Sequence, residues 1–131
     1  MEFTKDANLY NPLVLAYIGD SLYDLYVRER LIKENGDLSA HRLHVLSINF
    51  VKAHGQSAAI AAIENMLDDE EIAAYKRGRN TKSFTVPKNA DVGEYRRATG
   101  FEALLGWLYV KGRKDRLCEI MNMAYESQKS E

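Results

Sequence analysis

Apolar side chains recur at helical spacing over almost the whole chain, and this pattern restricts the fold more than any other feature. They return every three or four residues, and no segment alternates between apolar and polar residues for long enough to predict a β-strand. The pattern breaks at glycine, proline and asparagine, which commonly mark helix ends. The sequence therefore predicts an all-α bundle of five to seven helices.

Signals for helix ends place the individual helices. Asn11 is expected to cap the first helix, with Pro12 in its first turn, and Asn35-Gly36 to end it. Asn80 to Asp91 reads as a loop, which we expect to be mobile. The other predicted helices cover residues 39–66, with a bend or break at Gly55, residues 69–77, capped by Asp68-Asp69 and ended by Gly78, residues 93–110, and residues 114–127.

Length and composition indicate one folded domain over residues 1–131. Hydrophobic residues make up 46% of the chain, which is enough for a core. No apolar run reaches about 18 residues, so we expect neither a membrane span nor a membrane partner. We also expect no secretory signal. The one cysteine, Cys118, fits a reducing cytoplasm, and its place in an apolar helical pattern predicts a core or near-core thiol.

Positive charge is concentrated in one part of a nearly neutral chain. The net charge of −1 argues by itself against a nucleic-acid-binding protein. However, residues 76–97 carry +5, because only Asp91 and Glu94 oppose seven basic residues. This basic window predicts a local positive surface on a neutral body. Its basic residues are Lys76, Arg77, Arg79, Lys82, Lys88, Arg96 and Arg97.

Two carboxylates stand in apolar helical segments that also contain small residues. Gly19-Asp20 lies in the first predicted helix, where we expect desolvation of the aspartate, and Glu102 lies between Gly100 and Gly106. Small residues let helices pack closely, so two such helices would bring Asp20 and Glu102 together. Two carboxylates at close range favour a divalent cation between them, and Mg²⁺ prefers such oxygen ligands. The segment around Asp20, taken alone, also fits another interpretation. Gly19 would then only allow close helix packing, and Asp20 would be an ordinary surface aspartate.

The two carboxylate segments resemble the motifs of one enzyme family. Leu15-Ala16-Tyr17-Ile18-Gly19-Asp20-Ser21-Leu22 resembles the signature helix of the ribonuclease III catalytic domain, and Thr99 to Tyr109 resembles its second catalytic helix. The gap between the motifs, the helix order and the basic turn at 76–80 agree with the family. The resemblance covers residues 11–128 and implies a ribonuclease III-like helical bundle.

The chain departs from the usual family pattern in three ways. Most members have a glutamate at the position of Ala16 and an aspartate at that of Thr99. We also expect no double-stranded-RNA-binding domain after the catalytic domain. These departures resemble the compact Mini-ribonuclease III subgroup, for which the implied role is maturation of the large-subunit (23S) ribosomal RNA precursor.

The resemblance implies a metal-dependent endoribonuclease that cuts double-stranded RNA. Asp20 and Glu102 are then the catalytic residues and the ligands of Mg²⁺, for which Mn²⁺ can substitute. The number of ions stays open: one held firmly, or a second that arrives with the substrate. Asp24 either supports Asp20 without itself binding the metal or is an ordinary exposed carboxylate.

The implied partners are double-stranded RNA and a second copy of the chain. The signature helix, with Tyr17, is the expected seam of a homodimer that cuts both strands. A ribosomal protein on the precursor is a further expected partner. The residues expected to bind RNA are Lys76, Arg77, Arg79, Lys82, Arg96 and Arg97.

Two other functions fit parts of the sequence. A ribonuclease III-like module that binds RNA or the ribosome without cutting fits Ala16 and Thr99, but intact Asp20 and Glu102 argue against it. A helical protein-interaction domain without a nucleic-acid partner fits the helical pattern, but the charge of the basic window argues against it.

Overall fold

A computed structural model describes residues 2–82 and 86–129 of the chain. Within these residues it contains six α-helices and two short 3₁₀ helices, and no strand, which confirms the predicted all-α class. No helix in this part of the chain is long and apolar enough to span a membrane. The helices are α1 (Pro12–Glu34), α2 (Ala40–Val51), α3 (Ala53–Ile63), α4 (Asp69–Asn80), α5 (Val92–Val110) and α6 (Lys114–Lys129), with 3₁₀ turns at Ala7–Leu9 and Glu64–Met66.

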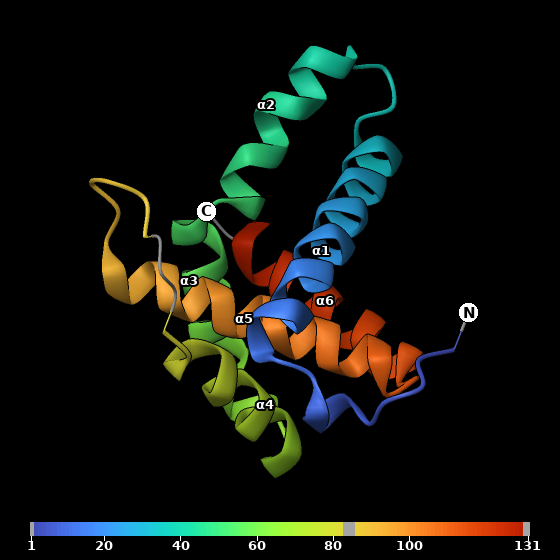
Figure 1. The fold of residues 1–131 in the computed structure, drawn as a ribbon. Helices are drawn as coiled ribbons and strands as arrows, with labels where there is room; N and C mark the ends of the chain where they lie inside the picture. Colours follow the sequence, from blue (N-terminus) through green and yellow to red (C-terminus); the bar gives the residue numbers. More distant parts are fainter. Residues whose placement is uncertain (1, 83–85, 130–131) are drawn as a thin grey trace.

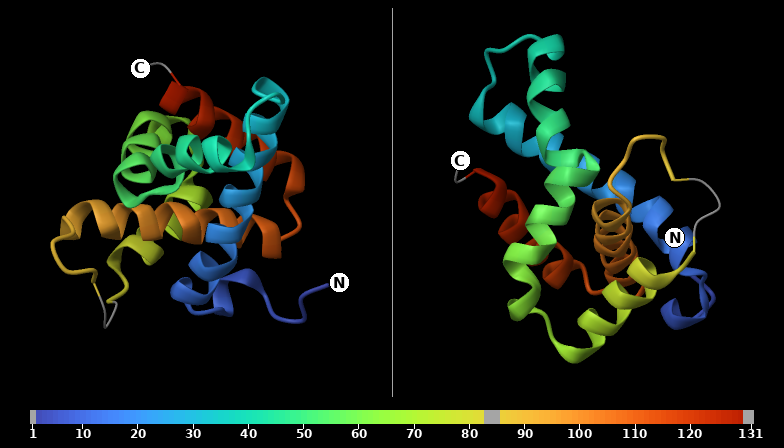
Figure 2. Two further views of the ribbon diagram at one scale, coloured as in Figure 1. Left: turned by 90° about the horizontal axis from the view of Figure 1, so that it is seen from above. Right: turned by 90° about the vertical axis from the view of Figure 1, so that its left-hand side faces the viewer.

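Helix α5 runs through the middle of the molecule. Helices α1, α3, α4 and α6 pack around it, as Figure 1 and the end-on view of Figure 2 show. Every residue from Ala103 to Leu108 is buried, including the indole of Trp107. A helix that is covered on all sides must be apolar on all sides, which explains the uniform composition of this segment.

Two glycines bring the backbones of α1 and α5 into direct contact. A Cβ atom built on Gly19 would lie 1.8 Å from the carbonyl oxygen of Glu102, and one built on Gly106 would lie 1.9 Å from that of Leu15. Each helix therefore has a glycine that contacts the backbone of the other helix. On each helix, this glycine is four residues from the carbonyl group that the other helix's glycine contacts. This reciprocal crossing fixes both the separation and the register of the two helices.

Helix α4 confirms its predicted start but not its predicted end. Asp68 caps it, and Asp68 and Glu71 form a reciprocal capping box. The helix continues past Gly78 to Asn80, because Gly78 serves packing and not termination. A Cβ atom there would lie 2.5 Å from Cβ of Ala103 on α5.

The long helical region predicted over residues 39–66 is divided into α2, α3 and a 3₁₀ turn. The break falls at Lys52, whose ψ of 159° is extended, three residues before the expected Gly55. Gly55 still makes the break possible, since a Cβ atom on it would lie 2.2 Å from the carbonyl oxygen of Asn49. The carbonyl group of Val51, the last residue of α2, accepts a hydrogen bond from the side chain of Gln56 on α3.

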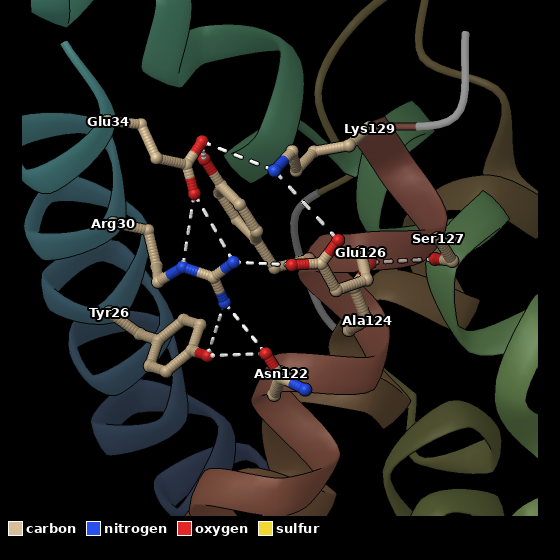
Figure 3. Close-up of polar contacts among 9 residues, drawn as sticks. Tyr26, Arg30, Glu34, Asn122, Ala124, Glu126, Ser127 and Lys129 are labelled. Atoms are coloured by element: carbon tan, nitrogen blue, oxygen red, sulfur yellow. Dashed lines mark hydrogen bonds and ion pairs between the residues drawn. The ribbon is translucent and has the colours of Figure 1, made fainter.

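A polar network joins α1 to the C-terminal helix α6 (Figure 3). The Arg30 guanidinium donates to Tyr26 and Asn122, both at 2.8 Å, and pairs with Glu126. The neighbouring Glu34 accepts a hydrogen bond from Tyr125 at 3.1 Å. These contacts hold the far end of α1, while its first half packs on α5.

Cys118 and the loop after α4 differ in how far the structure tests their predictions. Cys118 is exposed, so its prediction as a core or near-core thiol was wrong. Leu117 and Ile120 form part of the buried face of α6, and Cys118 lies outside that face. Residues 83–85 of the predicted loop lie outside the described residues, so the mobility of that loop stays a prediction.

We predict that Gly19→Ala lowers the free energy of unfolding by about 3 kcal/mol, because the added methyl group forces two backbones apart. Urea denaturation measures this loss. Gly93→Ala is the matched control, since its Cβ atom would meet only the ends of the Arg97 and Asp91 side chains, and alanine favours the helix by up to about 1 kcal/mol. Equal stability of the two variants would show that the crossing tolerates a side chain.

Candidate active site

The crossing of α1 and α5 places Asp20 beside Glu102, as the small residues of the two segments predicted. Asp20 is exposed, and Glu102 is mostly buried. Burial, together with the neighbouring Asp20 carboxylate, raises the pKa of Glu102 from 4.5 to about 8. The sequence interpretation had assigned the desolvation to Asp20, and in the structure Glu102 carries it instead.

A third polar side chain, from α3, reaches this pair. Gln56 is only 1% exposed, and its Nε2 atom donates to the carbonyl oxygen of Val51 at 2.8 Å and to Oε2 of Glu102 at 3.4 Å. Its Oε1 atom is buried and accepts no hydrogen bond from the residues that the structure describes. Sequence reasoning missed Gln56, although an amide in the alanine-rich stretch of α3 was a signal that could have revealed it.

The positions where the family usually has two more carboxylates contribute no charge. Ala16 is buried in the core. The Thr99 hydroxyl donates to the carbonyl oxygen of Tyr95 on its own helix at 3.0 Å. Over residues 2–82 and 86–129, no group of three or more His, Cys, Asp or Glu side chains is placed to hold a metal ion.

The donor set of Asp20, Glu102 and Gln56 fits a hydrated divalent cation. Asp20 and Glu102 offer carboxylate oxygens, which Mg²⁺ and Mn²⁺ accept as ligands. A cation would relieve the repulsion that now favours protonated Glu102. Its water molecules would be donors for the unpaired Oε1 atom of Gln56. Mg²⁺ usually takes only one or two protein carboxylates and keeps several waters, so two carboxylates suffice.

Asp24 lies one turn after Asp20 and has a partner of its own. Its carboxylate pairs with Nε of Arg28 at 3.3 Å on the exposed side of α1. This ion pair favours the second alternative left open by the sequence, an ordinary surface carboxylate.

The basic residues divide into two sets according to their contacts. Arg77 donates to Asn8, Arg97 donates to Ser57, and Arg79 lies over the Tyr75 ring. The other three of the six residues expected to bind RNA, Lys76, Lys82 and Arg96, are exposed, as is Arg77. The end of α4 and the start of α5 lie side by side in Figure 1, and Thr81, Arg96 and Thr99 line one small hollow between them.

An apolar surface adjoins Asp20 on the outer side of α1. Tyr17 is 83% exposed and Val14 is 53% exposed, although the side chains are large and apolar. They border a hollow of about 360 Å³ that Asp20 and Ser21 also line. Exposed apolar patches of this kind mark interaction surfaces.

Comparison with known proteins relates this arrangement to one family. Residues 13–113 match the Ribonuclease III domain. A Mini-ribonuclease 3 from Clostridium tetani is 49% identical, with 99% of this chain and 89% of that protein covered. One from Brevibacillus brevis is 44% identical, with 95% and 92% covered. A crystal structure of a protein from Fusobacterium nucleatum has a TM-score of 0.82 at 30% identity, with 95% of this chain and 99% of that chain covered.

These similarities extend over almost the whole chain and include both carboxylate helices. Both motifs lie within the matched residues, on helices α1 and α5, which cross at the carboxylate pair. The chain therefore belongs to the ribonuclease III family, within its compact Mini-ribonuclease 3 subgroup, and is a ribonuclease.

Proposed function

We propose that this ribonuclease is a metal-dependent endoribonuclease that cuts double-stranded RNA in the cytoplasm. The pairing of Asp20 with Glu102 at the α1–α5 crossing is the observation that carries this proposal. The proposed natural substrate is a stem of the 23S ribosomal RNA precursor, and a ribosomal protein on that precursor is a proposed partner.

The proposed reaction is hydrolysis of a phosphodiester by water, which forms a bond to phosphorus while the bond to the 3′ oxygen breaks. Asp20 and Glu102 would hold Mg²⁺ or Mn²⁺, which offsets the negative charge that develops on the phosphate. Asp20 is the exposed member of the pair, which supports a role in which it would orient the attacking water and accept its proton. Glu102 accepts a hydrogen bond from the side chain of Gln56 and would serve as the less exposed ligand.

The RNA duplex would lie against the end of α4 and the start of α5. Lys76, Lys82 and Arg96 are exposed and free to reach phosphates, and the contacts of Arg77, Arg79 and Arg97 hold those side chains in place. Cationic contacts to phosphates and 2′-hydroxyls read the shape of a duplex more than its sequence.

A homodimer would place one such site on each strand. A duplex has a local two-fold axis, and a two-fold symmetric enzyme matches it. The exposed Tyr17 and Val14, with the hollow beside them, supply an apolar surface for the second copy. Because Asp20 also lines this hollow, the proposed interface lies next to the site.

We predict that Asp20→Asn and Glu102→Gln each reduce cleavage of a labelled RNA duplex by more than about 100-fold at low salt with Mg²⁺, because each removes a charged ligand. Gel analysis of the products measures the rate. Glu29→Gln, an exposed residue of the same helix, is the control and should cut normally.

Other outcomes of this experiment separate the alternative functions. A parent protein that binds the duplex without cutting it would be a binding module, as the uncharged Ala16 and Thr99 positions suggest. A parent that neither binds nor cuts would refute both RNA functions.

Sedimentation of the parent protein without RNA should give the mass of two chains, because we expect a homodimer.

Glu102 should make the stability of the metal-free protein fall as the pH rises. Its pKa is about 8 in the folded protein and near 4.5 without the fold. The folded state therefore holds the proton more tightly, and this stabilisation is complete below pH 4.5 and lost as the pH rises through 8. The slope is at most about 1.4 kcal/mol per pH unit.

Urea denaturation in the presence of EDTA, at several pH values between 5 and 9, measures this effect. Subtraction of the Glu102→Gln curve removes the contribution of all other groups. Parallel curves for the two proteins would contradict the raised pKa. Added Mg²⁺ should restore stability chiefly at the higher pH values, because the cation favours the ionised carboxylate.

We predict that Arg96→Ala weakens duplex binding and lowers the slope of log K against log salt by about 1, because one phosphate contact is lost. Fluorescence anisotropy at several salt concentrations measures both quantities. Arg42→Ala is the matched control, an exposed arginine on α2 outside the basic window. Equal slopes for Arg96→Ala and the parent would remove Arg96 from the RNA surface.

A further inference from the structure

We propose that Gln56 is a positioning residue of this site, whose side-chain amide orients Glu102 toward the cation and accepts a hydrogen bond from the cation's water. This proposal rests on the proposed metal-dependent function. It assigns a role to a residue outside both sequence motifs, on a helix that neither motif includes.

The contacts of Gln56 fix its amide group in one orientation. The backbone N–H of Gln56 donates to the carbonyl oxygen of Lys52 at 3.0 Å, which anchors the residue in the first turn of α3. One side-chain N–H donates to the free carbonyl group of Val51, at 2.8 Å, and a second reaches Glu102, at 3.4 Å. Because Nε2 has only two hydrogens, both are used, and the amide plane cannot turn without losing a partner.

A purely structural role explains only part of this arrangement. Gln56 satisfies the last carbonyl of α2, as a residue that holds the α2–α3 break would. That role does not require the contact with Glu102. It also leaves Oε1 buried without a donor among the described residues, which costs free energy.

Gln128 on α6 shows what a glutamine with a structural role looks like in this fold. Its Nε2 donates to the carbonyl oxygen of Phe50 at 2.9 Å, and its Oε1 accepts a hydrogen bond from the Tyr23 hydroxyl. Both ends of this amide are paired within the protein. Gln56 differs at both ends: its Nε2 atom also donates to Glu102, and its Oε1 atom accepts no hydrogen bond from the described residues.

A hydrated cation supplies the donor that Gln56 lacks. Mg²⁺ bound by only two carboxylates keeps several water molecules, and each is a strong hydrogen-bond donor. The N–H of Gln56 meanwhile favours the ionised form of Glu102, which is the form that binds a cation. The Nε2 end of the amide therefore donates to the metal ligand Glu102, and the Oε1 end accepts a hydrogen bond from water bound to the same ion.

Binding of Mn²⁺, measured from the EPR signal of the free ion, tests this role without reference to catalysis. We expect Gln56→Met, which keeps the length and volume of the side chain, to raise the dissociation constant for Mn²⁺ about tenfold, since residues that orient metal ligands have effects of this size. The Mg²⁺ concentration for half-maximal RNA cleavage should rise in parallel. Gln128→Met removes an equivalent amide elsewhere and should bind Mn²⁺ like the parent.

A second measurement uses the unmodified protein and does not depend on the folding of a variant. We expect the ¹H–¹⁵N signals of the Gln56 side-chain amide to shift when Mg²⁺ is added, and those of Gln128 to stay in place. Gln56→Met with the parent's Mn²⁺ affinity, or Gln56 amide signals that ignore Mg²⁺, would overturn the proposal.

These results also separate the two proposals. A parent protein that binds no Mn²⁺ and cuts no duplex would refute the metal-dependent function and the role of Gln56 together. A parent that binds Mn²⁺ and cuts the duplex, while Gln56→Met binds Mn²⁺ equally well, would refute the role of Gln56 alone.

Discussion

The direct backbone contact between α1 and α5 is the constraint on which the rest of this structure depends. Gly19 lies against the Glu102 carbonyl and Gly106 against that of Leu15, so the two helices cross in one register only. That register places the side chain next to Gly19, the Asp20 carboxylate, beside the side chain of Glu102. The same short segments that bring the helices together therefore also bring the acids together, and packing and chemistry are inseparable here.

Such an arrangement is unfavourable for the protein by itself. Glu102 is mostly buried beside a second carboxylate, and it therefore stays largely protonated below about pH 8. The buried Oε1 atom of Gln56 accepts no hydrogen bond from the described residues. The surrounding fold offsets these costs with the apolar packing of α5 and with the Arg30 network that ties α1 to α6. The proposed cation would stabilise the folded protein, because it would relieve the repulsion between the carboxylates and its water would pair with the Gln56 oxygen.

The sequence predicts those features of the structure that depend on neighbouring residues. Asn11 and Asp68 cap their helices as expected, because a cap is a local hydrogen bond. The carboxylate pair was also predictable, because both segments contain small residues that allow two helices to pack closely. Features that depend on distant partners were not predictable: whether Gly78 ends a helix or packs on α5, and which carboxylate is buried, are decided by helices elsewhere in the chain.

The uncharged residues around the pair decide what kind of metal site this chain can form. Ala16 is buried, and the Thr99 hydroxyl donates to its own helix, so the protein offers a cation two negative charges and a neutral amide. A site with four carboxylates would hold a divalent ion tightly but would repel the phosphates of RNA whenever the ion was absent. With two carboxylates, the proposed ion keeps positions for water and phosphate oxygens. In the proposed function, cation and duplex would each strengthen the binding of the other, and the basic residues at the ends of α4 and α5 would supply the remaining attraction.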